Sequence, residues 1–410
     1  MKKYNIAIIG AGSAGLIAAI IAAQSGRRVI LIERNPRIGR KLLATGNGRC
    51  NLTNRLVTPD RYHGAAPEFI GTVLNQFDQS ATMQFFENSG LLMKEEDNGR
   101  IFTRTNQASS VVEIMRLALS ESGVDLMLDT QVTGIEKAAS WVISTGGKPA
   151  IETEKLIIAT GGRAAHPLGT TGDGLYWAQK LGHTLTPIYP ALVPIETVET
   201  WPKDIQGIKV EAKVRAVTSG RMIGEQTGDL LFTAYGVSGL AALALARSIA
   251  PVMQSFTVQL HIDLFAEMSE TELDQTLQRI FQNHPRRIIR ESLAGVLPDS
   301  LIAVVLRLAK TKETIQSREI SKIKCLSIIK VMKDLTLTVS KLRPLKEAQV
   351  TAGGIDTREV DPHTLESKIH KGLYFAGEVL DVDGDSGGFN LQWAWSSGYV
   401  AGLSTTSDSV

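Results

Sequence analysis

The sequence contains little cysteine and carries almost no net charge. Only two cysteines, Cys50 and Cys325, occur in 410 residues, and they lie far apart in no CxxC-type spacing. This rarity argues against a redox-active cysteine pair and predicts reduced thiols in the cytoplasm. The 44 Lys and Arg residues are balanced by 42 Asp and Glu residues, which gives a net charge of +2. So small an excess predicts neither a nucleic-acid partner nor binding to a membrane surface.

Long apolar runs and metal-ligand motifs are also absent. A membrane-spanning helix needs about 20 apolar residues, and the nearest candidate, residues 237–253, is interrupted by Gly239, Arg247 and Pro251. The chain starts with lysines after its first methionine, but glycines break the apolar residues that follow, so no signal peptide is expected. No catalytic triad or metal-ligand cluster stands out. The sequence therefore predicts no metal site and assigns no catalytic residue.

The strongest pattern occupies the first 33 residues. Short apolar runs there are typical of buried parallel strands, and they flank a glycine turn of GxGxxG spacing and a helix. The order is strand, glycine turn, helix, strand and acid, at residues 5–9, 10–15, 13–25, 29–32 and Glu33. This order predicts a dinucleotide-binding βαβ unit, because a glycine turn without a ligand would not need the acid or the flanking strands.

Each part of this unit suits a dinucleotide. Gly10 permits the tight turn, Gly12 lets the backbone approach a pyrophosphate, and Gly15 lets the helix pack against the strand. The start of the helix, at Ser13 and Ala14, offers N–H donors and the positive end of the helix dipole to the anion. The acid after the second strand is placed to accept hydrogen bonds from the adenosine ribose.

Residues 34–54 form a segment rich in glycine, cations and small polar residues. Such a loop can wrap an anionic ligand, with Arg40, Lys41 or Arg49 as countercharges and the backbone of residues 45–48 as donors. Composition alone is equally compatible with a solvated surface loop.

Residues 39–54 closely resemble a signature of the bacterial HI0933-like flavoproteins, also called the BaiN family of NAD(P)/FAD-dependent oxidoreductases. In that family the segment lies against FAD. The resemblance therefore implies cofactor contacts in this region at Arg34, Lys41, Gly48, Arg49, Cys50 and Asn51. We interpret Cys50 as a small packed residue and not as a redox thiol.

The middle of the chain supplies another part of the expected site. Residues 156–162 predict a strand that runs into a glycine turn. In flavoproteins of this kind an Ala-Thr-Gly closes the cofactor site, so the resemblance implies contacts at Thr160 and Gly161. A small β-meander is expected before this strand, and the backbone of Val132 within it is our candidate for contact with adenine. Its three strands are expected at residues 124–128, 131–136 and 141–144.

Other segments predict the remaining architecture. Residues 68–90 have helical spacing of apolar side chains. Beyond residue 195 the pattern changes to alternation, which predicts antiparallel strands with turns at residues 219–220 and 227–229. Residues 269–329 are helical in period, and the cluster of Arg286, Arg287 and Arg290 is interpreted as a solvated face.

The strongest family match lies in residues 348–402. A short strand there leads to a carboxylate that can accept a hydrogen bond from a ribityl hydroxyl. A helix follows, and its first N–H groups are expected to point at the flavin pyrimidine ring, which becomes anionic on reduction. The implied contacts are Gly377, Glu378, Gly388, Asn390 and Leu391.

Together these patterns predict an α/β fold. A Rossmann-like FAD-binding domain of the glutathione-reductase type is expected to be interrupted by an inserted β-barrel-like domain and a helical domain. The first part of the FAD-binding domain is expected at residues 1–190 and the second at 341–410, with the β domain at 191–262 and the helical domain at 263–340. The polar tail, residues 404–410, is expected to be disordered.

The expected chemistry is hydride transfer at N5 of bound FAD, with a small molecule as substrate. The resemblance implies two activities: reduction of an activated C=C bond in steroid or bile-acid intermediates, and O2-dependent oxidation of a small amine such as aminoacetone. We expect the reductase, with NAD(P)H as a possible transient reductant, although no second GxGxxG is present. A flavin-binding redox sensor, an NAD-binding dehydrogenase and a flavin-linked RNA-modifying enzyme are the alternatives. His166, Tyr235 and Arg163 are possible acids or bases, but each is interpreted as structural.

Overall fold

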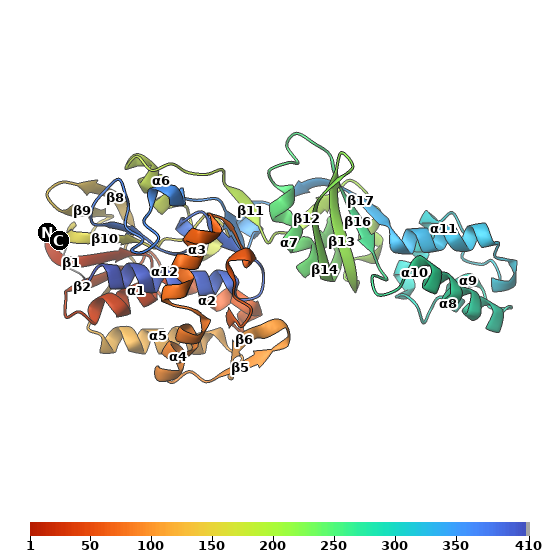
Figure 1. Cartoon of the computed structure of the whole chain (residues 1–410), viewed down its shortest axis with the longest axis horizontal. Coiled ribbons are helices and arrows are strands. Elements are labelled where there is room, and N and C mark those ends of the chain that lie inside the picture. Colours follow the sequence, from red (N-terminus) through yellow and green to blue (C-terminus); the bar gives the residue numbers. More distant parts are fainter. Residues whose placement is uncertain (407–410) are drawn as a thin grey trace. The chain divides into compact units, whose positions relative to one another are not determined.

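The computed structural model describes residues 1–406. Within it the chain forms two compact units, one from Met1–Tyr189 and Gln349–Val410 and the other from Pro190–Ala348 (Figure 1). The chain leaves the first unit in β11 (Tyr189–Ala191) and returns before β18 (Val350–Ala352). The tail predicted to be disordered begins at the last residue of the C-terminal helix, and residues 407–410 lie outside the described part of the chain.

A parallel sheet is the centre of the first unit. Strands β1 (Lys2–Ile9), β2 (Val29–Ile32), β10 (Ile151–Ile158) and β19 (Leu373–Phe375) lie side by side, with Ala7 opposite both Ile30 and Leu156. Where these four strands lie side by side, at residues 6–9, 29–32, 156–158 and 373–375, their side chains are buried and nearly all apolar, as parallel strands covered by helices require. The predicted βαβ unit is therefore confirmed, and the short strand predicted before the carboxylate is β19, which pairs with β10.

The predicted three-strand meander is partly wrong. Strands β8 (Val132–Lys137) and β9 (Trp141–Thr145) pair in antiparallel fashion with each other, and β9 pairs likewise with β10. The first strand, β7 (Asp125–Met127), instead pairs in parallel with β2 at the other edge of the sheet. It follows the helix α5 (Ala108–Glu121). A strand that is connected to its sheet by a crossover helix pairs in parallel with its neighbour.

Helices cover this sheet, and two of them lie very close together. Helix α1 (Ser13–Ala23) packs on α12 (Phe389–Ser404), as Figure 1 shows. A Cβ added at Gly398 would lie 2.3 Å from the carbonyl oxygen of Ala14, and one at Gly402 would lie 2.6 Å from that of Ala18. Glycine at these positions lets the C-terminal helix reach the first βαβ unit.

The single helix predicted at residues 68–90 is in fact two. Helix α3 (Pro67–Gln76) ends at Phe77, whose φ of −151° is not helical, and α4 (Gln79–Asn88) begins after Asp78. The Asp78 carboxylate accepts a hydrogen bond from the N–H of Ala81 at 2.8 Å, which caps the second helix. Asp78 marks the start of the second helix, but the apolar spacing that continues across it predicted a single helix.

The first unit also contains shorter elements around its sheet. Helices α2 (Arg40–Ala44) and α6 (Asp173–Lys180) follow β2 and β10 along the chain. The remaining strands form two small antiparallel sheets: β3 (Asn51–Asn54), β6 (Arg100–Thr103) and β5 (Met93–Glu96) in one, and β4 (Tyr62–Gly64) and β20 (Val382–Gly384) in the other.

The second unit contains a closed barrel, as the sequence predicted. Its strands follow one another around the barrel in the order β12 (Ile195–Thr197), β15 (Gly236–Ser238), β14 (Arg221–Thr233), β13 (Lys209–Thr218), β16 (Val258–Asp263) and β17 (Leu335–Leu342). The predicted turn at Ser219 and Gly220 joins β13 to β14 with φ values of 48° and 76°. The turn predicted at residues 227–229 is wrong, because Gly228 is extended within β14 and pairs with Ala212.

Helices complete the second unit. Helix α7 (Leu240–Ile249) follows β15 and packs on β14, and the region predicted to be helical contains α8 (Glu270–Asn283), α9 (Ile289–Ser292), α10 (Asp299–Leu308) and α11 (Lys322–Lys333). Barrel and helices share one apolar core that includes Leu260, Leu277 and Ile328. Among the described residues, no helix is both long and apolar enough to cross a membrane.

Candidate cofactor site

The glycine turn after β1 has two glycines that the fold requires and one that it does not. Gly10 has a φ of 103°, and a Cβ there would lie 2.5 Å from the carbonyl oxygen of Ala159. A Cβ on Gly15 would lie 1.8 Å from the carbonyl oxygen of Gly10. A Cβ on Gly12 would meet no protein atom within 4 Å, and its φ of −82° is open to any residue. Gly12 therefore leaves an open approach to the backbone.

The start of α1 fits an anion at this approach. Its N-cap, Gly12, makes no side-chain capping bond, and no acidic residue occupies the first turn of the helix. The N–H groups of Ser13 and Ala14 belong to this uncapped turn, whose orphan donors and dipole favour negative charge. The geometry suits the pyrophosphate of a dinucleotide.

Glu33 lies beside the turn but is already engaged. Its Oε2 accepts a hydrogen bond from the N–H of Ala11 at 2.8 Å, and its Oε1 accepts bonds from the backbone and side-chain nitrogens of Asn35 at 2.9 and 2.6 Å. The carboxylate thus clamps the glycine turn to the end of β2. Its predicted contact with a ribose stays a prediction.

The residues after Glu33 connect it with the other candidate contacts. The N–H of Thr130, just before Val132, donates to the carbonyl oxygen of Glu33 at 3.0 Å, so the start of β8 lies beside the end of β2. The guanidinium of Arg34 donates to Thr171 at 2.5 Å and pairs with Asp173 at 3.0 Å. Arg34 therefore orders the loop before α6.

Lys41 and Glu378 join the two distant halves of the expected site. The Lys41 ammonium lies 2.5 Å from Oε2 of Glu378, although the residues are 337 positions apart. The other carboxylate oxygen accepts a hydrogen bond from the N–H of Thr351 at 2.8 Å. The Thr351 hydroxyl accepts in turn from the N–H groups of Arg163 and Ala164, at 2.8 and 2.9 Å. Thr351 was missed by sequence reasoning because a threonine within a short strand gives no signal of its own.

The turn after β10 is shaped around this cluster. A Cβ on Gly162 would lie 2.3 Å from the Thr351 hydroxyl, so Glu378 and Thr351 reach this turn only because residue 162 is glycine. Gly161 is left-handed with a φ of 73°. The hydroxyl of Thr160 is buried and has no hydrogen-bond partner among the described residues. An unsatisfied buried hydroxyl fits a ligand that supplies the missing partner.

Gly377 fixes how the C-terminal strand meets α1. Its φ is 78°, and a Cβ there would lie 2.9 Å from the Cβ of Ala14. Its N–H donates to the Ser397 hydroxyl at 2.9 Å. The structure therefore brings Gly377, the residue before Glu378, to the start of the first helix.

The loop between α2 and β3 is held in an unusual backbone conformation. Gly46, Asn47, Gly48 and Cys50 all have positive φ values, 56°, 55°, 82° and 59°. The Cys50 side chain is fully buried, and this burial raises the pKa of its thiol to about 12. Cys50 is thus a neutral packed residue, as we interpreted it.

Arg49 and Asn51 of this loop have different environments. The Arg49 guanidinium pairs with Glu96, donates a hydrogen bond to the side-chain oxygen of Asn106 at 2.7 Å and lies 4.2 Å above the Phe102 ring. Among the described residues these partners already hold Arg49 on the β5–β6 hairpin. The Asn51 side-chain oxygen is buried, has no hydrogen-bond partner within residues 1–406, and would lie 3.0 Å from a Cβ on Gly388.

The start of α12 is the other uncapped helix end of the site. Gly388, its N-cap, has a φ of 101°, makes no side-chain capping bond, and would bring a Cβ to 2.5 Å from the Thr53 carbonyl oxygen. Asn390 holds the preceding loop by bonding the N–H and the carbonyl oxygen of Gly384, at 2.8 and 2.7 Å. Leu391 is half-buried. The side-chain amide of Asn390 therefore fixes the conformation of the loop. The N–H groups at the start of α12 are the donors that a ligand could use.

No side-chain contact was predicted for Gln392, yet it connects four segments. Its amide nitrogen donates to the Phe77 carbonyl, Thr82 and Ser396, at 3.2, 2.8 and 2.9 Å, and its oxygen accepts from Thr53 at 2.5 Å. The side chain is fully buried. It fixes the start of α12 against β3 and the α3–α4 break.

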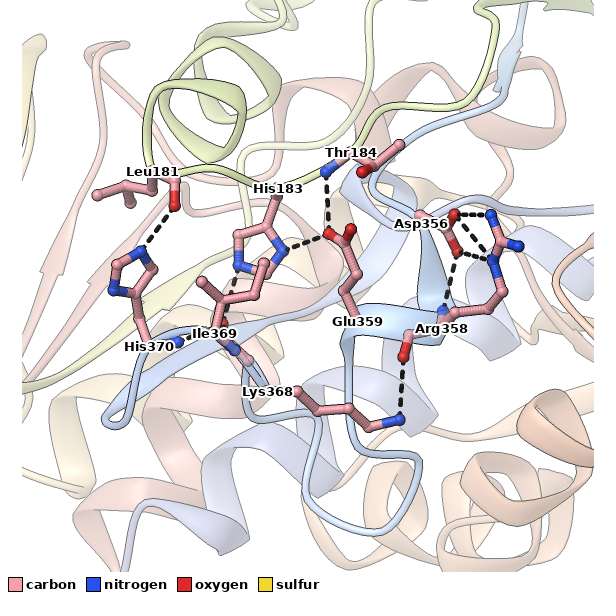
Figure 2. A network of polar contacts seen from close by, with 10 residues as sticks. Leu181, His183, Thr184, Asp356, Arg358, Glu359, Lys368, Ile369 and His370 are labelled. Carbon is pink, nitrogen blue, oxygen red and sulfur yellow. Dashed lines mark hydrogen bonds and ion pairs between the residues drawn. The ribbon is translucent and has the colours of Figure 1, made fainter.

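A separate polar network in the same unit, shown in Figure 2, is structural. The His183 ring is buried between Glu359 and Ser367, at 3.1 and 2.9 Å, and Glu359 also accepts from the N–H of Thr184. The Nε2–H of His370 donates to the Leu181 carbonyl oxygen at 2.7 Å, because a carbonyl oxygen can only accept. Burial lowers the pKa of His183, while Glu359 opposes the shift. The network fastens the segment after α6 to the segment before β19.

Taken together, the site offers an open backbone approach at Gly12, two uncapped helix starts and two unsatisfied polar atoms, Thr160 Oγ1 and Asn51 Oδ1. A diphosphate and a hydrogen-bonding ring system are the groups that such an arrangement accommodates. The residues present therefore fit FAD.

Comparisons with known proteins agree with this fit. The family model described as HI0933-like protein Rossmann domain matches residues 4–404. A 3-dehydro-bile acid delta(4,6)-reductase of Clostridium scindens is 36% identical over 401 residues, which are 97% of this chain and 98% of that protein. A ribosomal RNA dihydrouridine synthase of Escherichia coli is 30% identical over 403 residues, 98% of this chain and 97% of that protein.

The solved structures agree in fold. A 3-ketosteroid delta1-dehydrogenase from Sterolibacterium denitrificans matches with a TM-score of 0.53 and 14% identity, and the match covers 99% of this chain and 100% of that one. At this identity the likeness shows the fold alone, and that fold extends over nearly the whole chain.

Proposed function

Because the chain belongs to the HI0933-like family of FAD-dependent oxidoreductases, we propose that it reduces a carbon–carbon double bond conjugated with a carbonyl group. The observation that carries this proposal is the shared chemistry of two full-length relatives, one named for a bile-acid delta(4,6) reduction and one for making dihydrouridine. A 3-oxo steroid alkene and the uracil ring both present a C=C bond in conjugation with C=O. The common substrate class is therefore the enone, with a small steroid-like molecule as our first candidate.

We propose that FAD lies along the residues described above. Gly10, Gly12 and Gly15 shape the turn for the pyrophosphate, Glu33 and Val132 flank the adenosine, and Glu378 serves the ribityl chain. Bound FAD would supply a hydride acceptor and donor at its N5. The other proposed contacts are Ser13, Ala14, Arg34, Lys41, Gly48, Arg49, Cys50, Asn51, Thr160, Gly161, Gly377, Gly388, Asn390 and Leu391.

The same proposal includes the reductant and the role of each domain. NAD(P)H would supply the electrons transiently, which requires no second dinucleotide fold. The first unit would hold FAD, while the β and helical domains expected at 191–262 and 263–340 would form one inserted unit, in which β17 (Leu335–Leu342) completes the barrel. A cytoplasmic location accords with two buried, free thiols.

Product analysis tests the enone proposal. The purified protein is incubated without oxygen with NADPH or NADH and a 3-oxo-Δ4 steroid. The molecular masses of the products are then measured by mass spectrometry. We expect a gain of two hydrogen atoms that depends on enzyme and nicotinamide. Conversion of aminoacetone under air, with the steroid untouched, would favour the amine oxidase instead. A flavin that neither reductant nor oxygen changes would favour a sensor.

Uridine in ribosomal RNA is a second candidate substrate. The full-length match to the Escherichia coli enzyme favours it, although the net charge of the chain led us to expect no nucleic-acid partner. Incubation of deproteinised ribosomal RNA with the enzyme and NADPH, followed by nucleoside mass spectrometry, tests it directly. New dihydrouridine would support this substrate, and its absence while the steroid is reduced would exclude it.

A further inference from the structure

Positive charge is concentrated in one part of the second unit. Residues 284–333, from the end of α8 to the end of α11, contain eleven Lys and Arg but only four Asp and Glu, a net charge of +7. The rest of the chain therefore carries a net charge of −5, since the whole carries +2. The near-neutral total hides a strongly basic segment.

The backbone brings the basic positions of this segment together. The N–H of Ser317 donates to the carbonyl oxygen of Arg287 at 2.9 Å, and that of Arg318 donates to Pro285 at 3.1 Å. A β-bridge also joins Ile288 to Gln316. The chain before α9 thus runs antiparallel to the chain before α11, which places Arg286 and Arg287 beside Arg318.

Six exposed cations belong to these two stretches and the residues next to them, and we call them the basic cluster: Arg286, Arg287, Lys310, Lys312, Arg318 and Lys322. Within the described chain none of these side chains has an acidic partner, whereas the four acids of the segment are engaged elsewhere. Asp299 and Glu313 both pair with Arg290. Glu291 and Glu319 accept from the backbone N–H groups of Ile288 and Gln316, each at 3.3 Å. The positive charges of the basic cluster are therefore available to bind an anionic partner.

We propose that the basic cluster binds the phosphate backbone of RNA. This inference rests on the second candidate substrate above, and it names the surface that would hold that substrate. Arginine recognises phosphate oxygens in a bidentate manner, and an array of unpaired Lys and Arg supplies the sequence-independent part of nucleic-acid affinity.

An anionic membrane is the rival partner, because Ile323 and Leu326 on α11 are 78% and 47% exposed. A membrane-binding helix presents a broad apolar face beside its cations. Here three of the six cations lie on paired backbone stretches before the helix, and on α11 itself the exposed large apolar side chains are Ile323 and Leu326, which form a narrow face. The charge distribution therefore favours RNA.

Binding measured apart from turnover tests the inference. The FAD-loaded full-length protein is titrated into a fluorescein-labelled hairpin of about 40 nucleotides at several salt concentrations. The variant R286Q/R287Q/R318Q is compared with K203Q/R221Q/K346Q, which removes three exposed cations of the second unit outside the basic cluster. We expect the first variant to bind roughly tenfold more weakly, with a salt slope reduced by about 2, and the control to bind nearly as wild type.

Several results would overturn the inference: no RNA binding by the wild-type protein, equal losses in both variants, or binding to phosphatidylglycerol vesicles in preference to the hairpin. NAD(P)H oxidation and the flavin spectrum are recorded for every variant. If the hairpin binds as expected but no conjugated bond is reduced, the proposed function fails while this surface stands. If reduction proceeds and RNA does not bind, the reverse holds.

Discussion

At the scale of single residues, Gly12 separates what the fold needs from what a ligand needs. Its neighbours Gly10 and Gly15 would collide with backbone if they carried a Cβ, whereas a Cβ on Gly12 would meet open space. A ligand approach explains a glycine that neither conformation nor packing demands. This distinction can be tested, because a side chain at residue 12 should leave the fold intact but block the ligand.

We expect Gly12→Asp to fold but to lose FAD, because its carboxylate would occupy the place of the pyrophosphate and repel it. The flavin absorbance of the purified variant and its unfolding temperature check this. Gly295→Asp is the matched control, since Gly295 is exposed, has open space around a Cβ and has no positive φ. A yellow Gly12→Asp variant would refute our placement of the pyrophosphate.

Glu378 provides a second prediction at this scale. Glu378→Ala removes the acceptor for Lys41 and for the N–H of Thr351, and it removes the proposed ribityl contact. We expect the FAD dissociation constant to rise roughly tenfold, by about 1.4 kcal/mol, with the fold retained. Fluorescence titration of the apoprotein measures this. Glu378→Gln keeps an acceptor oxygen and should lose less, so equal affinity in all three proteins would remove Glu378 from the site.

Residue roles were predictable from sequence where a local motif carried them. The glycine turn and Glu33 follow from spacing within one βαβ unit. The hydrogen bonds of Gln392 could not be predicted, because its partners Phe77 and Thr82 are more than 300 positions away and meet it only in the folded chain. Arg49 was expected near the ligand from its charge, but the structure gives it Glu96 and Phe102 as neighbours.

At the scale of elements, the close contact between α1 and α12 joins the two ends of the chain. Gly398→Ala would place a methyl group 2.3 Å from the Ala14 carbonyl oxygen and force the helices apart. We expect the free energy of unfolding to fall by roughly 1–3 kcal/mol and FAD retention to weaken with it. Chemical denaturation and flavin absorbance measure both. Gly295→Ala, where a Cβ has open space, should change neither; an unaffected Gly398→Ala would show that α1 and α12 pack less tightly.

The His183 network predicts a pH dependence of stability. Burial holds the pKa of this ring below its usual value, so the folded state favours the neutral ring. The unfolded chain then binds more protons than the folded chain, and the contribution of His183 is present above about pH 6.5 and is lost as pH falls below it. We expect His183→Gln to unfold at a lower temperature than wild type at pH 7.5. The difference in unfolding temperature should be smaller at pH 5.5. A difference that does not shrink at low pH would contradict this.

Elements were predictable where periodicity and capping agreed. The strand runs and the helices of the second unit followed from apolar spacing. The break between α3 and α4 did not, because the apolar spacing continues across Asp78. Strand β7 was assigned to the wrong edge, since pairing between distant strands is decided by topology and not by its three residues.

At the scale of the whole molecule, the family resemblance and the alternation of sequence pattern predicted a Rossmann-type unit interrupted by a barrel and helices. Total composition was less informative than local composition. A net charge of +2 suggested no polyanionic partner, yet residues 284–333 carry +7. Electrostatic contacts with a large partner depend on local charge, because screening limits their range to about 10 Å.

The measurement that tests the central claim most directly is the visible spectrum of the purified protein without oxygen, during addition of NADPH or NADH and then of a conjugated substrate. We expect the oxidised flavin band to bleach with a nicotinamide and to return when a 3-oxo-Δ4 steroid or uridine-containing ribosomal RNA is added. A band that persists with both nicotinamides but bleaches with aminoacetone would contradict the claim and identify an amine oxidase.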